Sequence, residues 1–227
     1  MDVWKEQLQM DHEHFQRRSG WTVTWQGLPV FNGDHTNVPL HSPELYVIWN
    51  EKVKFLTAAA KDNPFGSDYF LWTDIGSFRS QRAAKNLITY PDPVRVATEL
   101  GESKVFFLEV YPFSSADRAL NPVSGLPERD FRLDIRLGGG IFGGHVKALA
   151  RYDAVYYETM GRMATAGRFV GKDQNVMSSV AVMYPDLVRL VAGGGDWWYG
   201  QFFFSQLADC DAFRVFMCPL ACHICDS

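Results

Sequence analysis

The sequence predicts an α/β domain, in which helices pack on the faces of a sheet. Short apolar runs rich in β-favouring residues alternate with longer segments whose apolar residues recur at helical spacing. Hydrophobic residues make up 47% of the 227 residues and charged residues 21%, proportions typical of a globular chain. A chain of this length is expected to bury about 70% of its unfolded surface. We therefore expect one main domain with short appendages.

The clearest helix signal begins at Ser42. Ser42 is a good N-cap and Pro43 suits the first helical position. Apolar residues between Leu45 and Ala60 then recur on one face. The helix is expected to end before Asn63-Pro64, because proline disfavours helix in the residue before it.

Further apolar runs and periodic segments predict the rest of the domain. Buried strands are expected over residues 69–72, 105–111 and 133–137, and helices over 93–100, 145–165 and 173–183. The glycines at 138–140 and 143–144 are expected in the connection from the third strand to the next helix.

The chain divides into three parts by composition. Residues 1–41 predict an N-terminal helix, one strand around Trp21–Trp25 and a loop. Residues 42–207 form the α/β domain, and residues 208–227 are a cysteine-rich C-terminal tail.

Charge and hydropathy argue against some classes of partner. The formal net charge is −4 and no run of Lys or Arg stands out, which argues against nucleic-acid binding. The apolar stretches fall far short of the roughly 18 residues that a membrane span needs. The first fifteen residues are too polar for a signal peptide. Aromatic residues reach 15%, which fits a deep core or a cleft that stacks on sugars.

Three places in the chain carry candidate site residues. Asp74 follows an apolar strand, and ligands of open α/β sheets bind outside the carboxyl ends of the strands. Gly143 and Gly144 would let a substrate approach the backbone before a helix N-terminus. Asp173-Gln174-Asn175 places one acid and two amides at a helix start, where they could bind sugar hydroxyls or where Asp173 could act as a base. Each pattern also fits a turn or a helix cap.

Three blocks in order resemble the HtrL/YibB family of glycosyltransferase-like proteins. They are LYVIWNEKVKFLTAAAKDNPFGSDYFLWTDIGSFR at 45–79, GGIFGGHVKALARYDAVYYETM at 139–160 and GKDQNVMSSVAVMYPDLVRLV at 171–191. The resemblance covers about residues 42–205. It implies a GT-A-like fold, that of the nucleotide-diphospho-sugar transferases, with a sheet flanked by helices.

The resemblance also implies roles for individual residues. Asp74 matches the first acid of the short motif that binds metal and nucleotide sugar in GT-A enzymes, so a Mn²⁺ or Mg²⁺ ion is expected there, while Gly76 stands where a second acid often does. Lys52 and Arg79 match the family blocks, and either could neutralise the charge of the donor's phosphates. Asp173 would be the catalytic residue. Gln174 and Asn175 would bind sugar or acceptor together with the glycine pair at 143–144.

The implied function is transfer of a sugar from a nucleotide-sugar donor to a hydroxyl of a glycan or protein. GT-A folds normally open with a nucleotide-binding βαβ unit, and residues before 42 offer no clear strand for it. We therefore expect a fold truncated at its N-terminus. This leaves a second hypothesis, a non-catalytic relic that binds nucleotide or glycan. A third is a secreted interaction module organised by the cysteine tail.

All four cysteines, Cys210, Cys218, Cys222 and Cys225, lie in the tail. They weakly resemble the end of a ShK-like disulfide module, and four cysteines allow three pairings. Free thiols and zinc are the alternatives, although the spacing is not a standard zinc pattern. Disulfides would favour the lumen of the secretory pathway.

Overall fold

The computed structural model describes residues 43–77, 90–132, 134–195, 197–198 and 200–204. The helix and strand expected before residue 42, the expected lack of an opening nucleotide-binding unit, Arg79 and the cysteine tail all concern residues outside these ranges. The described elements are, in chain order, α2 (Pro43–Asp62), β1 (Tyr69–Thr73), η1 (Ile75–Ser77), α4 (Pro93–Leu100), β2 (Val105–Glu109), η2 (Ala116–Arg118), β3 (Leu137–His145), α5 (Val146–Thr165), α6 (Asp173–Met183), β4 (Val188–Ala192) and α7 (Gly200–Phe203).

The described strands form one mixed sheet in the order β1-β3-β2-β4. β3 runs antiparallel to β1 and β2, and β4 runs parallel to β2. The carboxyl ends of β1, β2 and β4 therefore meet at one end of the sheet, together with the amino end of β3. The candidate site lies at this end.

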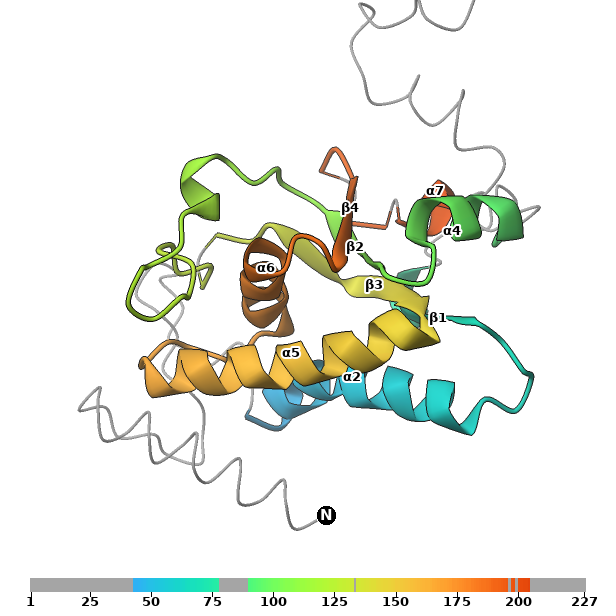
Figure 1. Cartoon of the computed structure of the whole chain (residues 1–227), viewed down its shortest axis with the longest axis horizontal. Coiled ribbons are helices and arrows are strands. Elements are labelled where there is room, and N and C mark those ends of the chain that lie inside the picture. The colour runs from blue at the N-terminus through green and yellow to red at the C-terminus, as the bar shows by residue number, and fades with distance from the viewer. Residues whose placement is uncertain (1–42, 78–89, 133, 196, 199, 205–227) are drawn as a thin grey trace, which may run out of the picture.

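Helices cover both faces of the sheet, as the α/β class predicts (Figure 1). Val105 and Phe107 of β2 point into a core shared with α2, α5 and α6. Phe106 and Leu108 point to the other face, where they pack with α4 and with Phe204 after α7. The two sets alternate because successive side chains of a strand face opposite sides.

Local signals place the helices, and the predicted helices α2, α4, α5 and α6 are confirmed. The Asp92 side chain caps α4 by accepting a hydrogen bond from the Arg95 N–H, with Pro93 at the first turn. His145 caps α5 in the same way through the Lys147 N–H.

The third strand is not where the sequence predicted it. β3 spans Leu137–His145, so the prediction of a strand over 133–137 followed by a glycine turn is wrong. The glycines belong to the strand because its neighbours come very close. A Cβ at Gly143 would lie 2.2 Å from the Phe70 carbonyl oxygen, and one at Gly144 would lie 2.5 Å from the Lys104 carbonyl oxygen.

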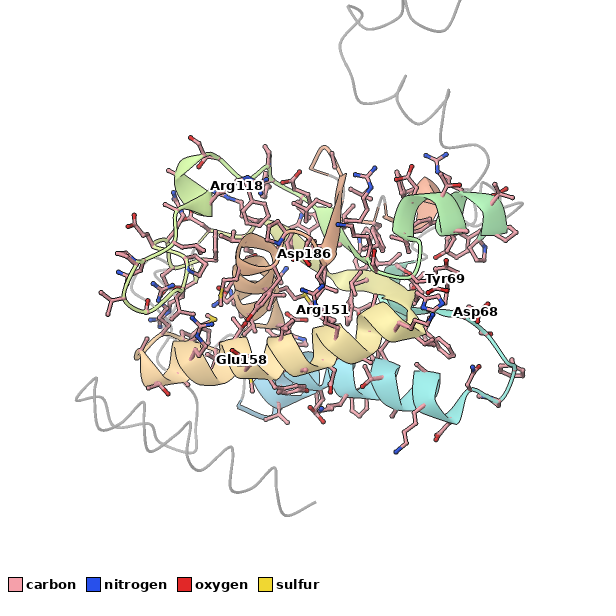
Figure 2. All side chains as sticks on the ribbon, viewed as in Figure 1. Asp68, Tyr69, Arg118, Arg151, Glu158 and Asp186 are labelled. Carbon is pink, nitrogen blue, oxygen red and sulfur yellow. The ribbon has the colours of Figure 1, made fainter. Side chains whose placement is uncertain are left out.

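Two further strands differ from expectation. β1 is half-buried rather than buried, because it is an edge strand with β3 as its one described neighbour. β4 was not predicted at all, although it pairs with β2. Near the amino end of β4, at the end of the sheet opposite the candidate site, Asp186 forms a surface ion pair of 2.8 Å with Arg151 of α5 (Figure 2).

Candidate functional site

A bulge in β3 shapes the site. Phe107 of β2 pairs with Phe142, but the next residue, Leu108, pairs with Gly138, so residues 139–141 bulge out of the ladder with β2. Bulges are common beside functional sites, where they redirect backbone groups. Here the Gly140 carbonyl accepts the Asp74 N–H at 2.8 Å, and the Gly139 carbonyl accepts the Lys52 ammonium at 2.9 Å.

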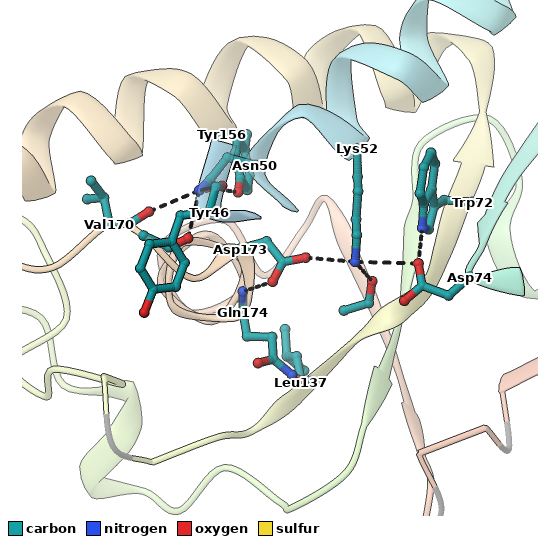
Figure 3. A network of polar contacts seen from close by, with 12 residues as sticks. Tyr46, Asn50, Lys52, Trp72, Asp74, Leu137, Tyr156, Val170, Asp173 and Gln174 are labelled. Carbon is teal, nitrogen blue, oxygen red and sulfur yellow. Dashed lines mark hydrogen bonds and ion pairs between the residues drawn. The ribbon is translucent and has the colours of Figure 1, made fainter. Parts of the chain in front are cut away.

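Lys52 joins the two acids that the sequence singled out (Figure 3). Its Nζ lies 3.2 Å from Oδ2 of Asp173 and 3.5 Å from Oδ1 of Asp74. The three side chains come from α2, from the end of β1 and from the first turn of α6. Asp74 and Asp173 thus contact one ammonium, but of Asp74, Gly143 and Asp173 it is Asp74 that lines the cleft beside them.

Asp74 lies in an open cleft of about 570 Å³. The cleft is lined by Trp72, Thr73, Asp74, Ile75, Gly76 and Trp198. The indole N–H of Trp72 donates to Oδ1 of Asp74 at 2.7 Å and holds that carboxylate in place. About a third of the Asp74 side chain, 35%, is exposed. Lys52, Asp74 and Asp173 are together called the centre. Asp74 is therefore the acid of the centre that a ligand in the cleft can reach.

Asp173 is buried, with 3% of its surface exposed. Burial raises the pKa of its carboxyl, and the neighbouring charge of Asp74 raises it further, while the Lys52 ammonium and the Gln174 N–H lower it in part. Oδ1 accepts the Gln174 N–H at 2.8 Å. Oδ2 contacts the Lys52 ammonium and has no other hydrogen-bond donor among the described residues. Asp173 therefore depends on Lys52 for the stability of its charged form.

The glycines that make room for the site are Gly139 and Gly140. A Cβ at Gly139 would lie 2.7 Å from Oδ2 of Asp173, and one at Gly140 would lie 2.7 Å from the ring of Trp198. Gly143 and Gly144, which the sequence favoured, pair with Leu71 and Phe70, three and four residues before Asp74 along β1. The structure thus does not bring that pair to the Asp74 carboxylate. The uninterrupted run of glycines at 138–140 was the signal for the correct ones.

Asn50 supports the centre from within the fold. Its side-chain N–H groups donate to the carbonyls of Val170 and Gly171, at 3.1 and 3.0 Å, and its Oδ1 accepts the Tyr156 hydroxyl at 2.6 Å. These bonds tie α2 to α5 and to the loop that leads into α6. They therefore set the position of Lys52 relative to Asp173.

The other predicted site residues have mixed positions. The Gln174 side chain donates to the Leu137 carbonyl at 3.0 Å, and the buried Asn175 side chain donates to the Phe169 carbonyl at 3.4 Å. Gln174 thus ties α6 to the start of β3, and Asn175 ties it to the preceding loop. Gly76 lies in η1 and lines the cleft.

Within the ranges that the structure describes, no three or more His, Cys, Asp or Glu side chains gather as metal ligands. In the same ranges, none of the helices has the length and apolar character needed to cross a membrane.

Comparison with known proteins supports the family suggested by the three sequence blocks. Neither the curated proteins nor the solved structures contain a match to this chain. The family model described as "Bacterial protein of unknown function (HtrL_YibB)" matches residues 31–216, which include Lys52, Asp74 and Asp173. The chain therefore belongs to the HtrL_YibB family.

Proposed function

We propose that this chain is a glycosyltransferase-like enzyme with a GT-A-like sheet. It transfers a sugar from a nucleotide-sugar donor to a hydroxyl of a glycan or protein. One observation carries the proposal: Lys52, Asp74 and Asp173 converge where β1 ends, beside an open cleft. Ligands of open α/β sheets bind outside the carboxyl ends of the strands, where these residues lie.

The cleft has the chemistry of a sugar site. A carboxylate accepts hydrogen bonds from sugar hydroxyls, and Asp74 offers one at the cleft wall. Indole rings present broad apolar faces that pack against the C–H faces of a sugar ring, and Trp72 and Trp198 line the same cleft. Asp74 is therefore the residue that contacts substrate in this proposal.

Asp173 takes a different role from the one the sequence suggested. Its burial keeps it from an acceptor hydroxyl in the cleft. In our proposal it is a positioning residue: it holds Lys52, and Lys52 in turn orients Asp74. In the reaction, the acceptor oxygen bonds to the sugar's anomeric carbon and its hydroxyl proton passes to solvent. The bond from that carbon to the donor's diphosphate breaks, and the nucleoside diphosphate leaves with that electron pair.

A thermal-shift screen of the full chain against nucleotide sugars tests the proposal. A ligand that binds the native state raises the melting temperature, by an amount that grows with its concentration over Kd. We expect at least one nucleotide sugar to raise it, and the Asp74→Asn variant to lose most of that shift. No shift with any nucleotide sugar, with or without Mn²⁺, would argue against the proposal.

A second candidate is a non-catalytic protein that binds a nucleotide or glycan. The burial of Asp173 favours it, because one of the two expected acids is then withheld from substrate. The two candidates differ in turnover. Release of nucleoside diphosphate from a bound donor, in the presence of mixed glycan acceptors, supports the enzyme, while binding without release supports the second candidate.

A further inference from the structure

We propose that Lys52 is itself the cation of this centre, so that Asp74 and Asp173 do not hold a divalent metal between them. This inference deepens the proposed function and rests on it for its meaning. It makes Asp74 a direct hydrogen-bond acceptor for sugar hydroxyls rather than a metal ligand.

The surroundings of Lys52 Nζ are those of a bound cation. Three oxygens surround it: the Gly139 carbonyl at 2.9 Å, Asp173 Oδ2 at 3.2 Å and Asp74 Oδ1 at 3.5 Å. They come from the β3 bulge, from α6 and from the end of β1. Carboxylate and carbonyl oxygens are the ligands that hard divalent cations prefer, at about 2.0–2.6 Å. An ammonium has three donors and fits the longer distances found here.

A metal ion could enter this space only by displacing Lys52. The Lys52 side chain is 7% exposed and extends from α2 to the Gly139 carbonyl of β3. Its ammonium lies 5.9 Å from the centre of the Trp72 ring. A divalent ion beside a retained ammonium would be repelled by it. The residues present therefore do not fit the divalent cation that the sequence led us to expect on Asp74, at the position between the two acids.

The buried acid shows what the ammonium does for the centre. Apart from Lys52, Asp173 Oδ2 has no hydrogen-bond donor among the described residues, so without Lys52 its charge would be uncompensated beside that of Asp74. Two carboxylates and one carbonyl around an empty space are a set of oxygen ligands. Removal of the lysine should therefore create a metal site that the wild-type chain lacks.

The test is a titration of the full-length chain with Mn²⁺ alone, in which electron paramagnetic resonance counts the free ion. We expect the single variant Asp74→Asn to bind Mn²⁺ as wild type does. Lys52→Met should gain a site that binds Mn²⁺ at least about tenfold more tightly than wild type does, which corresponds to about 1.4 kcal/mol. Adding Asp74→Asn or Asp173→Asn to Lys52→Met should abolish the gain.

The matched control is Lys147→Met. Lys147 pairs with Glu102 on the surface, where both side chains are mostly exposed, so its removal frees one solvated carboxylate and should create no site. Gains of equal size in both methionine variants would contradict the inference, because they would show that loss of any lysine suffices.

The wild-type arm decides the matter even if Lys52→Met does not fold. A wild-type Mn²⁺ site that disappears in Asp74→Asn would overturn the inference. The readout uses no nucleotide sugar, so a failure of the proposed function in the thermal-shift screen leaves this result unaffected and the two failures can be told apart.

Discussion

Lys52 and Asp173 form a buried ion pair of 3.2 Å between two helices, α2 and α6, that are far apart in the sequence. Both side chains are almost fully buried, at 7% and 4% exposed. Removing one partner of such a pair leaves an uncompensated charge in the interior, which costs far more than the pair itself contributes. The pair thus ties the position of α6 to that of α2.

We expect Asp74→Asn to weaken ligand binding without unfolding the chain. Asparagine keeps an oxygen that can accept the Trp72 N–H, but it lacks the charge that strengthens a hydrogen bond to a hydroxyl. The affinity for an active nucleotide sugar should fall about tenfold to a hundredfold, since hydrogen bonds to charged groups contribute about 1.5–3 kcal/mol. Isothermal titration calorimetry measures the change.

Asp186→Asn is the control for this prediction. Asp186 lies at the end of the sheet opposite Asp74, and 65% of its side chain is exposed. Its replacement should leave the affinity unchanged. If Asp74→Asn binds as tightly as this control, Asp74 does not contact the ligand.

Asp173→Asn should remove a pH dependence of stability. Burial raises the pKa of Asp173 in the folded state, so folding favours its protonated form. Its contribution to the free energy of unfolding is therefore fully present below the unfolded pKa of about 4 and is lost as the pH rises through the higher folded value. Between pH 4 and 8, the free energy of unfolding in urea should fall more, or rise less, with pH in wild type than in the variant. Identical slopes in the two proteins would show that this carboxyl titrates normally.

Asp117→Asn should destabilise the fold away from the site. Asp117 is fully buried in η2, and its carboxylate contacts the guanidinium groups of Arg129 and Arg136 at 3.1 Å each. Losing the charge that these guanidinium groups and the Ser114 N–H bind should cost about 1.5–3 kcal/mol, because Arg129 and Arg136 themselves keep access to solvent. Asp134→Asn is the matched control, because Asp134 pairs with the same Arg129 but both side chains are 39% exposed. That loss should stay below about 1 kcal/mol. Equal losses in urea unfolding would contradict the difference in burial.

Asp117 should also contribute to acid unfolding. Burial alone would raise its pKa, but hydrogen bonds from the Ser114 N–H and Arg136 outweigh burial and lower the pKa to about 2. The stabilisation is thus present above the unfolded pKa of about 4 and is lost as the pH falls towards 2. The Asp117→Asn variant should lose less stability than wild type over that range, which circular dichroism can follow.

Two glycine substitutions should have opposite effects. Gly139→Ala places a methyl group 2.7 Å from Oδ2 of Asp173 and should cost about 1–3 kcal/mol, as overpacking does. Gly161→Ala in α5 meets nothing within 4 Å and should stabilise the helix by about 0.5–1 kcal/mol. Thermal unfolding measures both. A tolerated Gly139→Ala would mean that the bulge and Asp173 can move apart freely.

The sequence by itself determined where α2, α4, α5 and α6 begin and end. The Asp92-Pro93 cap and the Asn63-Pro64 stop act within one turn, so they work whatever the rest of the chain does. The sequence also pointed to Asp74 and Asp173, because each acid follows or begins an element that is locally recognisable.

Only the tertiary structure decided what those acids contact and how far they are buried. The long-range contact with Lys52 made Asp173 a buried partner rather than an accessible base, and no local pattern encodes such a contact. The glycines of β3 carry no side chains, so this segment lacks the alternating pattern that predicts a strand. The strand and its bulge are defined by their pairing with β1 and β2. Burial and ion pairing depend on residues distant in the sequence, so the geometry of the centre is a property of the assembled fold.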